Sequence, residues 1–292
     1  MPYAKAKDGT QLYYKDWGKG DPVVLLHGWP LTGDTWDDAA CALVEAGKRC
    51  IIPDRRGFGR SDQPWDGHDY DTYADDVAAV LEDAGVGEPV ALVGFSMGGG
   101  EVARFLTKQG AQRVSKAVLI SSVVPYMLQT EDNPDGVPQA KFDEMTAGMK
   151  KDRAHFFTGF FKDFYGVGPI NSPVSEEVLM NSWRQTMMAG LRPTLAAAKA
   201  FATTDFRPDL KSFTVPTLVI HGTKDKTVPI DATGRVVARE VPNAQLIEYD
   251  GSAHGLFAIE KDRLIDDLLA FLGGSATGAD QRSAIPMSHT AY

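Results

Sequence analysis

Short runs of consecutive apolar residues recur along the chain, and each run is followed by a glycine, a proline or a polar residue. The runs lie at residues 22–26, 50–52, 89–93, 117–120, 217–220 and 245–249. Strands that are apolar on both faces are typical of a parallel sheet that helices cover on both sides. Two further segments, residues 3–6 and 11–14, flank the pair Asp8-Gly9 and predict an antiparallel hairpin at the start of the chain.

Amphipathic segments with helical periodicity separate these runs. The clear cases lie at residues 34–46, 71–84, 98–109, 231–240 and 256–272. Strands that alternate with helices indicate a sheet built from right-handed crossovers. The predicted fold is therefore α/β, with a mostly parallel eight-stranded sheet and helices on both faces.

The alternation stops between residues 127 and 213, where the helical segments 141–164 and 173–201 have no clear strand between them. We interpret residues 127–213 as a helical cap inserted into a core of residues 1–126 and 214–272. A second independent domain is the alternative, but the strand pattern resumes afterwards and completes the sheet. Residues 273–292 are rich in Gly, Ser, Thr and Ala, and we expect a mobile or surface-lying tail.

Composition narrows the functional classes. Hydrophobic residues make up 43% of the chain and charged residues 24%, which is ordinary for a folded globular protein. No run approaches the roughly eighteen apolar residues of a membrane span, and the first residues lack an apolar signal core, so we expect a cytoplasmic protein. The net charge of −9, without long Lys or Arg runs, disfavours nucleic-acid binding. Cys41 and Cys50 lack metal-ligand spacing, so we expect two reduced thiols and no metal site.

One motif carries candidate chemistry. Gly94-Phe95-Ser96-Met97-Gly98 follows a predicted buried strand and opens a predicted helix. A serine at such a sharp turn is exposed for nucleophilic attack, and the flanking glycines relieve steric crowding. The helix start adds partial positive charge, and the Met97 N–H is an expected oxyanion donor. The alternative is an ordinary glycine-rich turn with a helix-capping serine.

A serine hydroxyl needs a base and an acid that orients the base. Asp225 and His254 follow the last two predicted strands in the chain order expected after such a serine. All three residues therefore lie at the carboxyl edge of the sheet, where open α/β sheets bind ligands. Asp250 is the rival acid, four residues before His254.

The other histidines are weaker candidates. We expect His27 and His221 to shape turns, and His68, His155 and His289 to be solvated surface residues.

The segment His27-Gly28-Trp29-Pro30 follows the first core strand and is expected to supply a second oxyanion donor. Pro30 has no N–H, so the Trp29 N–H is the candidate, and Pro30 favours an extended Trp29. A simple turn around a buried tryptophan is the alternative. The glycines of Gly57-Phe58-Gly59 do not continue as a dinucleotide-binding motif, so we expect a packed loop at the site's border.

Longer strings around these motifs resemble the α/β-hydrolase superfamily over residues 3–272, with the best match to its cofactor-free haloperoxidase, perhydrolase and arylesterase branch. The strings are His27-Gly-Trp-Pro-Leu-Thr-Gly-Asp-Thr-Trp36, Asp54-Arg-Arg-Gly-Phe-Gly-Arg-Ser61, Gly94-Phe-Ser-Met-Gly-Gly-Gly-Glu-Val-Ala-Arg104 and Thr204-Asp-Phe-Arg-Pro-Asp209. The resemblance implies Ser96 as nucleophile, His254 as base and Asp225 as orienting acid. Related dehalogenases and epoxide hydrolases carry Asp at the nucleophile position, so Ser96 argues against both activities.

The resemblance also implies two reactions in one site, without a cofactor: hydrolysis of short-chain or aryl esters, and formation of peracids with hydrogen peroxide. Pro30 after Trp29 is similar to the perhydrolase-leaning members, where the neighbouring carbonyl is thought to hold the peroxide. By the same matching, the acyl pocket is expected to be lined by Trp29, Pro30, Phe95, Met97, Val123, Phe156, Phe160 and Thr227. The i, i+4 pair Phe156 and Phe160 has cap packing as its alternative role. Relatives are often trimers or larger, which implies a homo-oligomer.

Two other functions stay open at this point. One is a C–C bond hydrolase, lactonase or amidase that uses the same triad. Such enzymes differ from esterases in their cap residues, and the motifs above do not distinguish these caps. The other is a binding protein that has kept the fold without catalysis, although an intact set of Ser96, Asp225 and His254 argues against it.

Overall fold

The computed structural model describes residues 2–87 and 89–273 of the chain, so the predicted tail lies almost wholly outside the described residues. One eight-stranded sheet runs through the molecule in the order β1-β2-β4-β3-β5-β6-β7-β8. The strands are β1 (Tyr3–Lys5), β2 (Gln11–Gly18), β3 (Asp21–Leu26), β4 (Lys48–Pro53), β5 (Val90–Phe95), β6 (Val114–Ile120), β7 (Thr217–Gly222) and β8 (Ala244–Tyr249). The pairs β1–β2 and β2–β4 are antiparallel and all other pairs are parallel, which confirms the predicted sheet.

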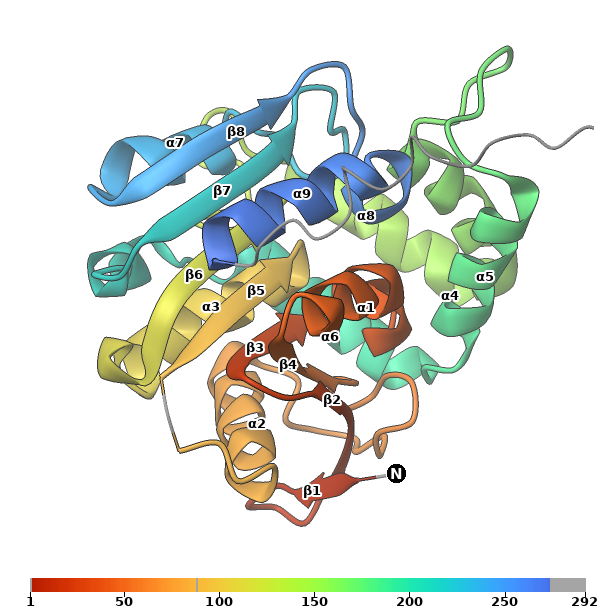
Figure 1. Cartoon of the computed structure of the whole chain (residues 1–292). Helices are drawn as coiled ribbons and strands as arrows, with labels where there is room; N and C mark the ends of the chain where they lie inside the picture. Colours follow the sequence, from red (N-terminus) through yellow and green to blue (C-terminus); the bar gives the residue numbers. More distant parts are fainter. Residues whose placement is uncertain (1, 88, 274–292) are drawn as a thin grey trace, which may run out of the picture.

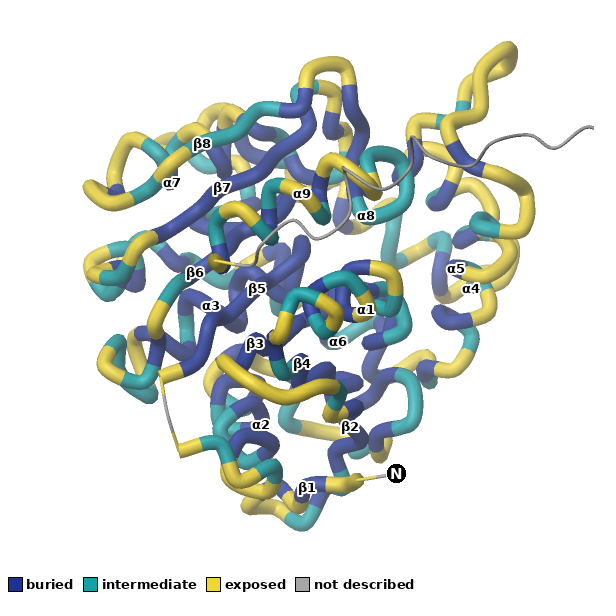
Figure 2. Tube along the Cα trace, in the orientation of Figure 1, coloured by how far each residue is buried: buried dark blue, intermediate teal, exposed yellow. Residues whose placement is uncertain are grey.

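Helices cover both faces of this sheet (Figure 1). They are α1 (Asp37–Glu45), α2 (Tyr70–Asp83), α3 (Met97–Lys108), α4 (Gln139–Tyr165), α5 (Glu176–Met187), α6 (Leu191–Thr203), α7 (Gly234–Glu240), α8 (Leu256–Ile259) and α9 (Lys261–Leu272). Helices α1 and α9 pack together on one face, whereas α2 packs against α3 on the other. The central strands are consequently buried on both sides (Figure 2).

The edges of the sheet explain where burial differs from the prediction. Every residue of β5 is buried, as its uninterrupted apolar run predicts. Strand β8 is only half-buried over most of its length, because it lies at the edge of the sheet and is paired on one side alone. The predicted hairpin forms between β1 and β2, with Gly9 at a φ of 92° in the turn.

Helices α4, α5 and α6 form an insertion between β6 and β7, beyond the carboxyl ends of the parallel strands (Figure 1). We call these three helices and their connections the helical insertion. Helix α4 is kinked at Asp152, whose φ of −159° and ψ of 91° are not helical. The predicted segment 173–201 is two helices rather than one, because Gly190 begins α6 with an extended backbone. The exact division at residues 127 and 213 stays a prediction.

The last predicted helix, residues 256–272, is also interrupted. Helix α8 ends at Ile259 and α9 begins at Lys261, with Glu260 at a φ of −128° between them. The Glu260 carboxylate accepts a hydrogen bond from the Ser252 hydroxyl, so this break ties α9 to the loop that follows β8.

Candidate active site

Ser96 lies on a sharp turn between β5 and α3. Its φ of 53° and ψ of −117° are unusual for a residue with a side chain. The glycines around it make the turn sterically feasible: a Cβ on Gly94 would lie 2.4 Å from the Gly98 carbonyl oxygen, and one on Gly98 would lie 2.3 Å from the Leu26 carbonyl oxygen. The strand and helix therefore hold the serine in a strained conformation at the carboxyl edge of the sheet.

Two loops bring the other members of the predicted triad to Ser96. Asp225 follows β7, and His254 follows β8. The Ser96 Oγ lies 2.9 Å from His254 Nε2, and His254 Nδ1 lies 2.6 Å from Asp225 Oδ2. All three side chains are buried or nearly so. The arrangement is triad-like: a hydroxyl faces one imidazole nitrogen while a carboxylate faces the other.

Asp225 is held by more than His254. Its Oδ1 accepts hydrogen bonds from the backbone N–H groups of Thr227 at 2.9 Å and Val228 at 2.8 Å. His221 Nε2 lies 3.3 Å from Asp225 Oδ2. Burial by itself would raise the pKa of Asp225, but His254 and His221 outweigh it and lower the pKa well below the ordinary range. The carboxylate is therefore ionised and fixed in orientation.

The rival acid and two histidines lie elsewhere. Asp250 is exposed and accepts a hydrogen bond from the Thr223 hydroxyl at 3.1 Å. His155 is exposed in α4, and His289 lies outside the described residues. The expectation that His68 is a solvated surface residue is wrong, because it is buried and its Nε2 lies 2.9 Å from the Pro64 carbonyl oxygen.

His27 and His221 are both fully buried at strand ends. His221 Nε2 lies 3.0 Å from the Val228 carbonyl oxygen, as well as near Asp225, so it braces the loop that carries the acid. The prediction of a turn-shaping role did not foresee this contact with Asp225, because the sequence does not show which way the imidazole points.

The predicted oxyanion donors belong to two separate segments. Met97 is the first residue of α3, and Trp29 lies in the segment 27–33 that follows β3, which we call loop 27–33. Within the described part of the chain, neither backbone N–H donates to a protein acceptor. The Trp29 ring is anchored instead, since its Nε1–H donates to the Thr194 carbonyl oxygen in α6 at 3.0 Å. The Trp29–Pro30 peptide bond is cis.

A cavity of about 460 Å³ opens beside Ser96. Predicted substrate-contact residues line it: Trp29, Val123, Phe156, Phe160 and Thr227. Pro30, Phe95 and Met97 are buried and lie outside the lining set; the Phe95 ring packs 5.0 Å from the His254 ring, centroid to centroid. Sequence reasoning missed other lining residues, namely Val137, Lys141, Phe142, Glu144, Met145, Asp163, Phe201, Lys226 and Val228.

A periodicity signal existed for some of the missed residues. Phe142 and Met145 are three apart on α4, and Phe156 and Phe160 are four apart on the same helix. The remaining lining residues come from elements whose approach to Ser96 depends on how the insertion packs, which periodicity does not show.

The aromatic wall of the cavity comes mainly from the helical insertion. The Trp29 ring lies 5.4 Å from both Phe160 and Phe201, and Phe156 stacks on Phe160 at 6.0 Å. Charged residues at the cavity, including Lys141 and Glu144, are exposed and pair with each other at 2.9 Å. The site is therefore apolar in depth and polar where it meets solvent.

The part of the chain that the structure describes contains no group of three or more His, Cys, Asp or Glu side chains arranged to hold a metal ion. Among the same residues, no helix is both long enough and apolar enough to cross a membrane.

Comparisons with known proteins agree with this geometry. A family model described as alpha/beta hydrolase fold matches residues 21–261. A non-heme chloroperoxidase from Kitasatospora aureofaciens is 43% identical over 93% of this chain and 99% of its own length. A bifunctional esterase/perhydrolase from Acinetobacter calcoaceticus is 46% identical with the same coverage.

A solved structure of a bromoperoxidase from Bacillus anthracis has a TM-score of 0.89 and 42% identity, over 93% of this chain and 99% of that one. The chain therefore belongs to the α/β-hydrolase family and, within it, to the group of cofactor-free haloperoxidases and esterase/perhydrolases.

Proposed function

We propose that this protein is a serine esterase that acts on short-chain or aryl carboxylic esters through an acyl-enzyme. The observation that carries the proposal is the hydrogen-bonded chain from Ser96 Oγ through His254 to Asp225, at distances of 2.9 and 2.6 Å, beside an aromatic cavity. An apolar pocket with a few converging polar groups is the usual form of a small-molecule site.

The first half of the reaction acylates the serine. Ser96 Oγ attacks the ester carbonyl carbon while His254 Nε2 takes the hydroxyl proton. The N–H groups of Trp29 and Met97 donate to the oxyanion, and one such donor is typically worth about 3–4 kcal/mol. The tetrahedral intermediate then expels the alcohol oxygen, which receives the proton from His254. Asp225 holds the imidazole tautomer and stabilises the imidazolium.

The second half transfers the acyl group to a small nucleophile. Water attacks the acyl carbon and gives a proton to His254. His254 passes this proton to the departing Ser96 Oγ, which releases a carboxylic acid and free Ser96. Hydrogen peroxide in place of water releases a peracid by the same steps. The peracid then oxidises a halide ion outside the site, which yields the hypohalous acid and the carboxylate. The names of the relatives, esterase/perhydrolase and chloroperoxidase, support both outcomes.

The cavity supports the substrate class. Its apolar lining by Trp29, Phe156, Phe160 and Phe201 suits an aryl or short alkyl group, and its charged residues lie at the solvent side. The C–C hydrolase, lactonase and amidase alternatives use the same triad, and they predict low turnover of a simple aryl acetate.

The test compares the wild type with Ser96→Ala in hydrolysis of p-nitrophenyl acetate, and Ser115→Ala is the matched control. Ser115 is exposed at the amino end of β6, whereas the triad lies at the carboxyl edge of the parallel strands. We expect hydrolysis to fall to the background rate in Ser96→Ala and to be unchanged in Ser115→Ala. Hydrolysis that persists in Ser96→Ala would contradict the proposal.

The perhydrolase activity has its own test. The resemblance to perhydrolase-leaning relatives rests on Pro30 after Trp29, so Pro30→Leu is expected to lower the ratio of peracid formation to ester hydrolysis. Peracid is measured through bromination of monochlorodimedone in the presence of acetate, peroxide and bromide. An unchanged ratio in Pro30→Leu would contradict this role of Pro30.

We also propose that the protein is a homo-oligomer of three or more copies, as the family resemblance implies. Light scattering of the purified protein measures the mass directly. A mass equal to one chain of 31.7 kDa would contradict the assembly.

A further inference from the structure

Two oxyanion donors act together only if their N–H groups converge on the same oxygen atom. Met97 belongs to α3 and Trp29 to loop 27–33, and these segments are far apart in the sequence. The distance between the two donors therefore depends on what fixes the loop against the helix. A shift of a few tenths of an ångström changes such hydrogen bonds, because donors must lie about 2.7–3.1 Å from the oxyanion.

A buried ion pair joins the two segments. Arg55, in the loop after β4, donates from Nε to Glu101 Oε1 at 2.6 Å and from Nη2 to Glu101 Oε2 at 2.8 Å. The side chains are 3% and 4% exposed, so the pair is shielded from solvent. Glu101 lies four residues after Met97 on α3, one helical turn along the same face. This side of Arg55 is thus fixed to the helix that carries one donor.

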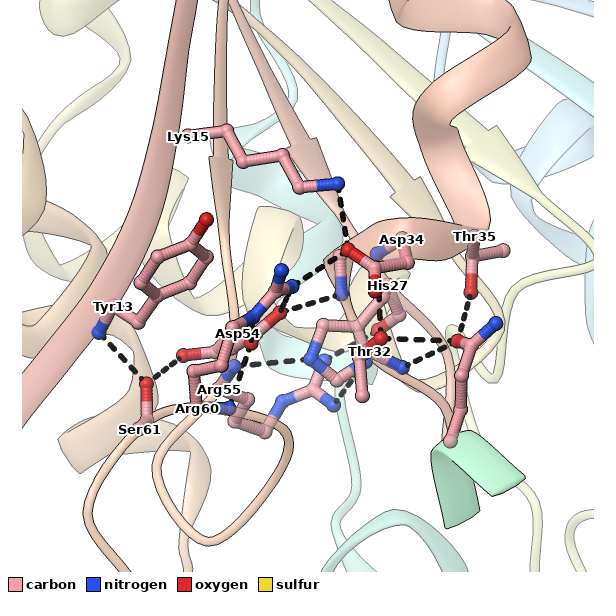
Figure 3. A network of polar contacts seen from close by, with 12 residues as sticks. Tyr13, Lys15, His27, Thr32, Asp34, Thr35, Asp54, Arg55, Arg60 and Ser61 are labelled. Atoms are coloured by element: carbon pink, nitrogen blue, oxygen red, sulfur yellow. Dashed lines mark hydrogen bonds and ion pairs between the residues drawn. The ribbon is translucent and has the colours of Figure 1, made fainter. Parts of the chain in front are cut away.

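The other side of Arg55 contacts loop 27–33 (Figure 3). Its Nη2 donates to the His27 carbonyl oxygen at 2.6 Å, and its backbone N–H donates to His27 Nε2 at 3.0 Å. His27 Nδ1 lies 2.9 Å from the Gly28 carbonyl oxygen, so Nδ1 carries the proton and Nε2 accepts. Burial and the Arg55 charge lower the pKa of His27, which keeps this neutral tautomer.

The loop and the turn at Ser96 are in close contact, so movement of one is transmitted to the other. A Cβ on Gly28 would lie 2.6 Å from Cδ1 of Phe95 and 3.1 Å from the Ser96 Cβ. The last residue of the loop is also held, since the Gly33 N–H donates to Asp54 Oδ1 at 2.8 Å.

We infer that the Arg55–Glu101 pair is a positioning device that sets the Trp29 donor in loop 27–33 against the Met97 donor in α3. The inference rests on the proposed esterase function. A buried ion pair is weak evidence for stability, because apolar residues of similar volume often stabilise a fold as well or better. Its contacts with both oxyanion segments give it a role that apolar residues would not fill.

The neighbouring residue supplies a matched control. Arg56 donates from Nε to Asp76 Oδ2 at 2.5 Å and from Nη2 to Asp76 Oδ1 at 2.6 Å, and both residues are buried. Its third contact is with Asp8, in the turn between β1 and β2. This second pair therefore links α2 to the hairpin and has no hydrogen bond to loop 27–33.

The experiment compares two double variants, Arg55→Met/Glu101→Leu and Arg56→Met/Asp76→Leu, in hydrolysis of p-nitrophenyl acetate. For the first we expect kcat to fall about 10- to 100-fold with KM within about twofold, since removal of one oxyanion donor costs about 10²–10³ in kcat. Inhibition by phenylboronic acid, whose adduct mimics the tetrahedral intermediate, is expected to weaken in parallel. For the control pair we expect kcat within about twofold of the wild type.

Circular dichroism and thermal unfolding report whether each variant folds. If Arg55→Met/Glu101→Leu does not fold, Glu101→Gln keeps the side-chain shape but leaves the buried Arg55 without its counter-charge. We expect it to lower the melting temperature and, in the folded protein, to lower kcat at least about threefold. An unchanged kcat in a folded variant, or an equal fall in the control pair, would overturn the inference. A wild type without Ser96-dependent hydrolysis would instead contradict the proposed function.

Discussion

The active-site cavity has two walls of different construction. At the sheet edge, Ser96, His254 and Asp225 are joined by hydrogen bonds of 2.9 and 2.6 Å, and backbone N–H groups hold Asp225. Across the cavity, the helical insertion presents aromatic rings at centroid distances of 5.4–6.0 Å, and packing alone fixes them. A directed polar wall suits bond-making, whereas an aromatic wall suits selection of substrate by shape.

Hydrogen bonds from Thr32 and Trp29 join loop 27–33 to the helical insertion. Gln185 of α5 accepts hydrogen bonds through Oε1 from the Thr32 N–H at 3.2 Å and the Thr32 hydroxyl at 3.0 Å. The Trp29 ring donates to the Thr194 carbonyl oxygen in α6. The insertion therefore contacts loop 27–33 through α5 and α6, while Arg55 contacts the same loop through the His27 carbonyl oxygen. This comparison predicts that substitutions at the sheet edge change kcat and that those in the insertion change KM or stability.

The largest expected effect is the loss of kcat on substitution of the orienting acid, Asp225. Asp225→Asn keeps the shape of the side chain but removes the charge that fixes the His254 tautomer, so kcat is expected to fall about 10³- to 10⁴-fold. Asp250→Asn, at the exposed rival acid, is expected to leave kcat within about twofold. Steady-state kinetics of p-nitrophenyl acetate hydrolysis measure both. An equal fall of kcat in the two variants would contradict the assignment of Asp225, rather than Asp250, as the orienting acid.

The next effect is on how the free energy of unfolding depends on pH. The pKa of Asp225 is lowered in the folded protein, so in mild acid the unfolded chain binds a proton there that the folded chain does not. The stabilisation from Asp225 is thus complete above about pH 5 and is lost as the pH falls below about 4; a shift of this kind is worth about 2–3 kcal/mol. Urea unfolding of the wild type and Asp225→Asn between pH 3 and 7 measures it. A stability difference that does not narrow in acid would contradict the lowered pKa.

A smaller effect is expected where loop 27–33 contacts the helical insertion. Gln185→Leu leaves the Thr32 N–H and hydroxyl without their acceptor in a buried place, which is expected to lower the free energy of unfolding by about 1–3 kcal/mol. Gln63→Leu is the matched control, because Gln63 also contacts the insertion, through the Met188 carbonyl oxygen and the Gly190 N–H, but is exposed. We expect about 0.5 kcal/mol or less for it. Equal losses in urea unfolding would show that burial of the contact is unimportant.

The smallest effect is on substrate selection. Phe160→Leu removes one aromatic contact from the cavity, and such contacts are worth about 0.5–1.5 kcal/mol, so KM for an aryl ester is expected to rise about 2- to 10-fold while kcat changes little. Phe161→Leu is the control, because Phe161 is buried away from the cavity lining and is expected to change the melting temperature without changing KM. A fall in kcat alone for Phe160→Leu would contradict the division between the walls.

The same two walls differ in how far the sequence predicts them. The apolar runs predict six of the eight strands because buried strands have a local signature, and the turn at Asp8-Gly9 predicts the other two as a hairpin. The strand ends place Ser96, Asp225 and His254 at one edge. The insertion is predicted as helical, but its rings facing the cavity depend on a kink at Asp152 and a break at Gly190 that periodicity does not show.

Polar contacts between distant segments were beyond sequence reasoning as well. In the sequence, Glu101 is one charged residue on a predicted glycine-rich helix. Only the fold shows that it pairs with Arg55, which lies 46 positions away in the chain. The burial of His68 was missed for the same reason, since its loop is polar and its burial comes from neighbours that are remote in sequence. A motif shows which residue types are available, and packing decides their partners.

The central claim is that Ser96 carries the acyl group, and the most direct measurement is to find that group on the protein. The wild type is mixed with p-nitrophenyl acetate, quenched with acid within the first turnovers and analysed by peptide mass spectrometry. The account predicts an acetyl group on the peptide that contains Ser96, and none on that peptide in Ser96→Ala. An acetyl group only on another side chain, such as the exposed Cys41, together with an unmodified Ser96 peptide during turnover, would contradict the account.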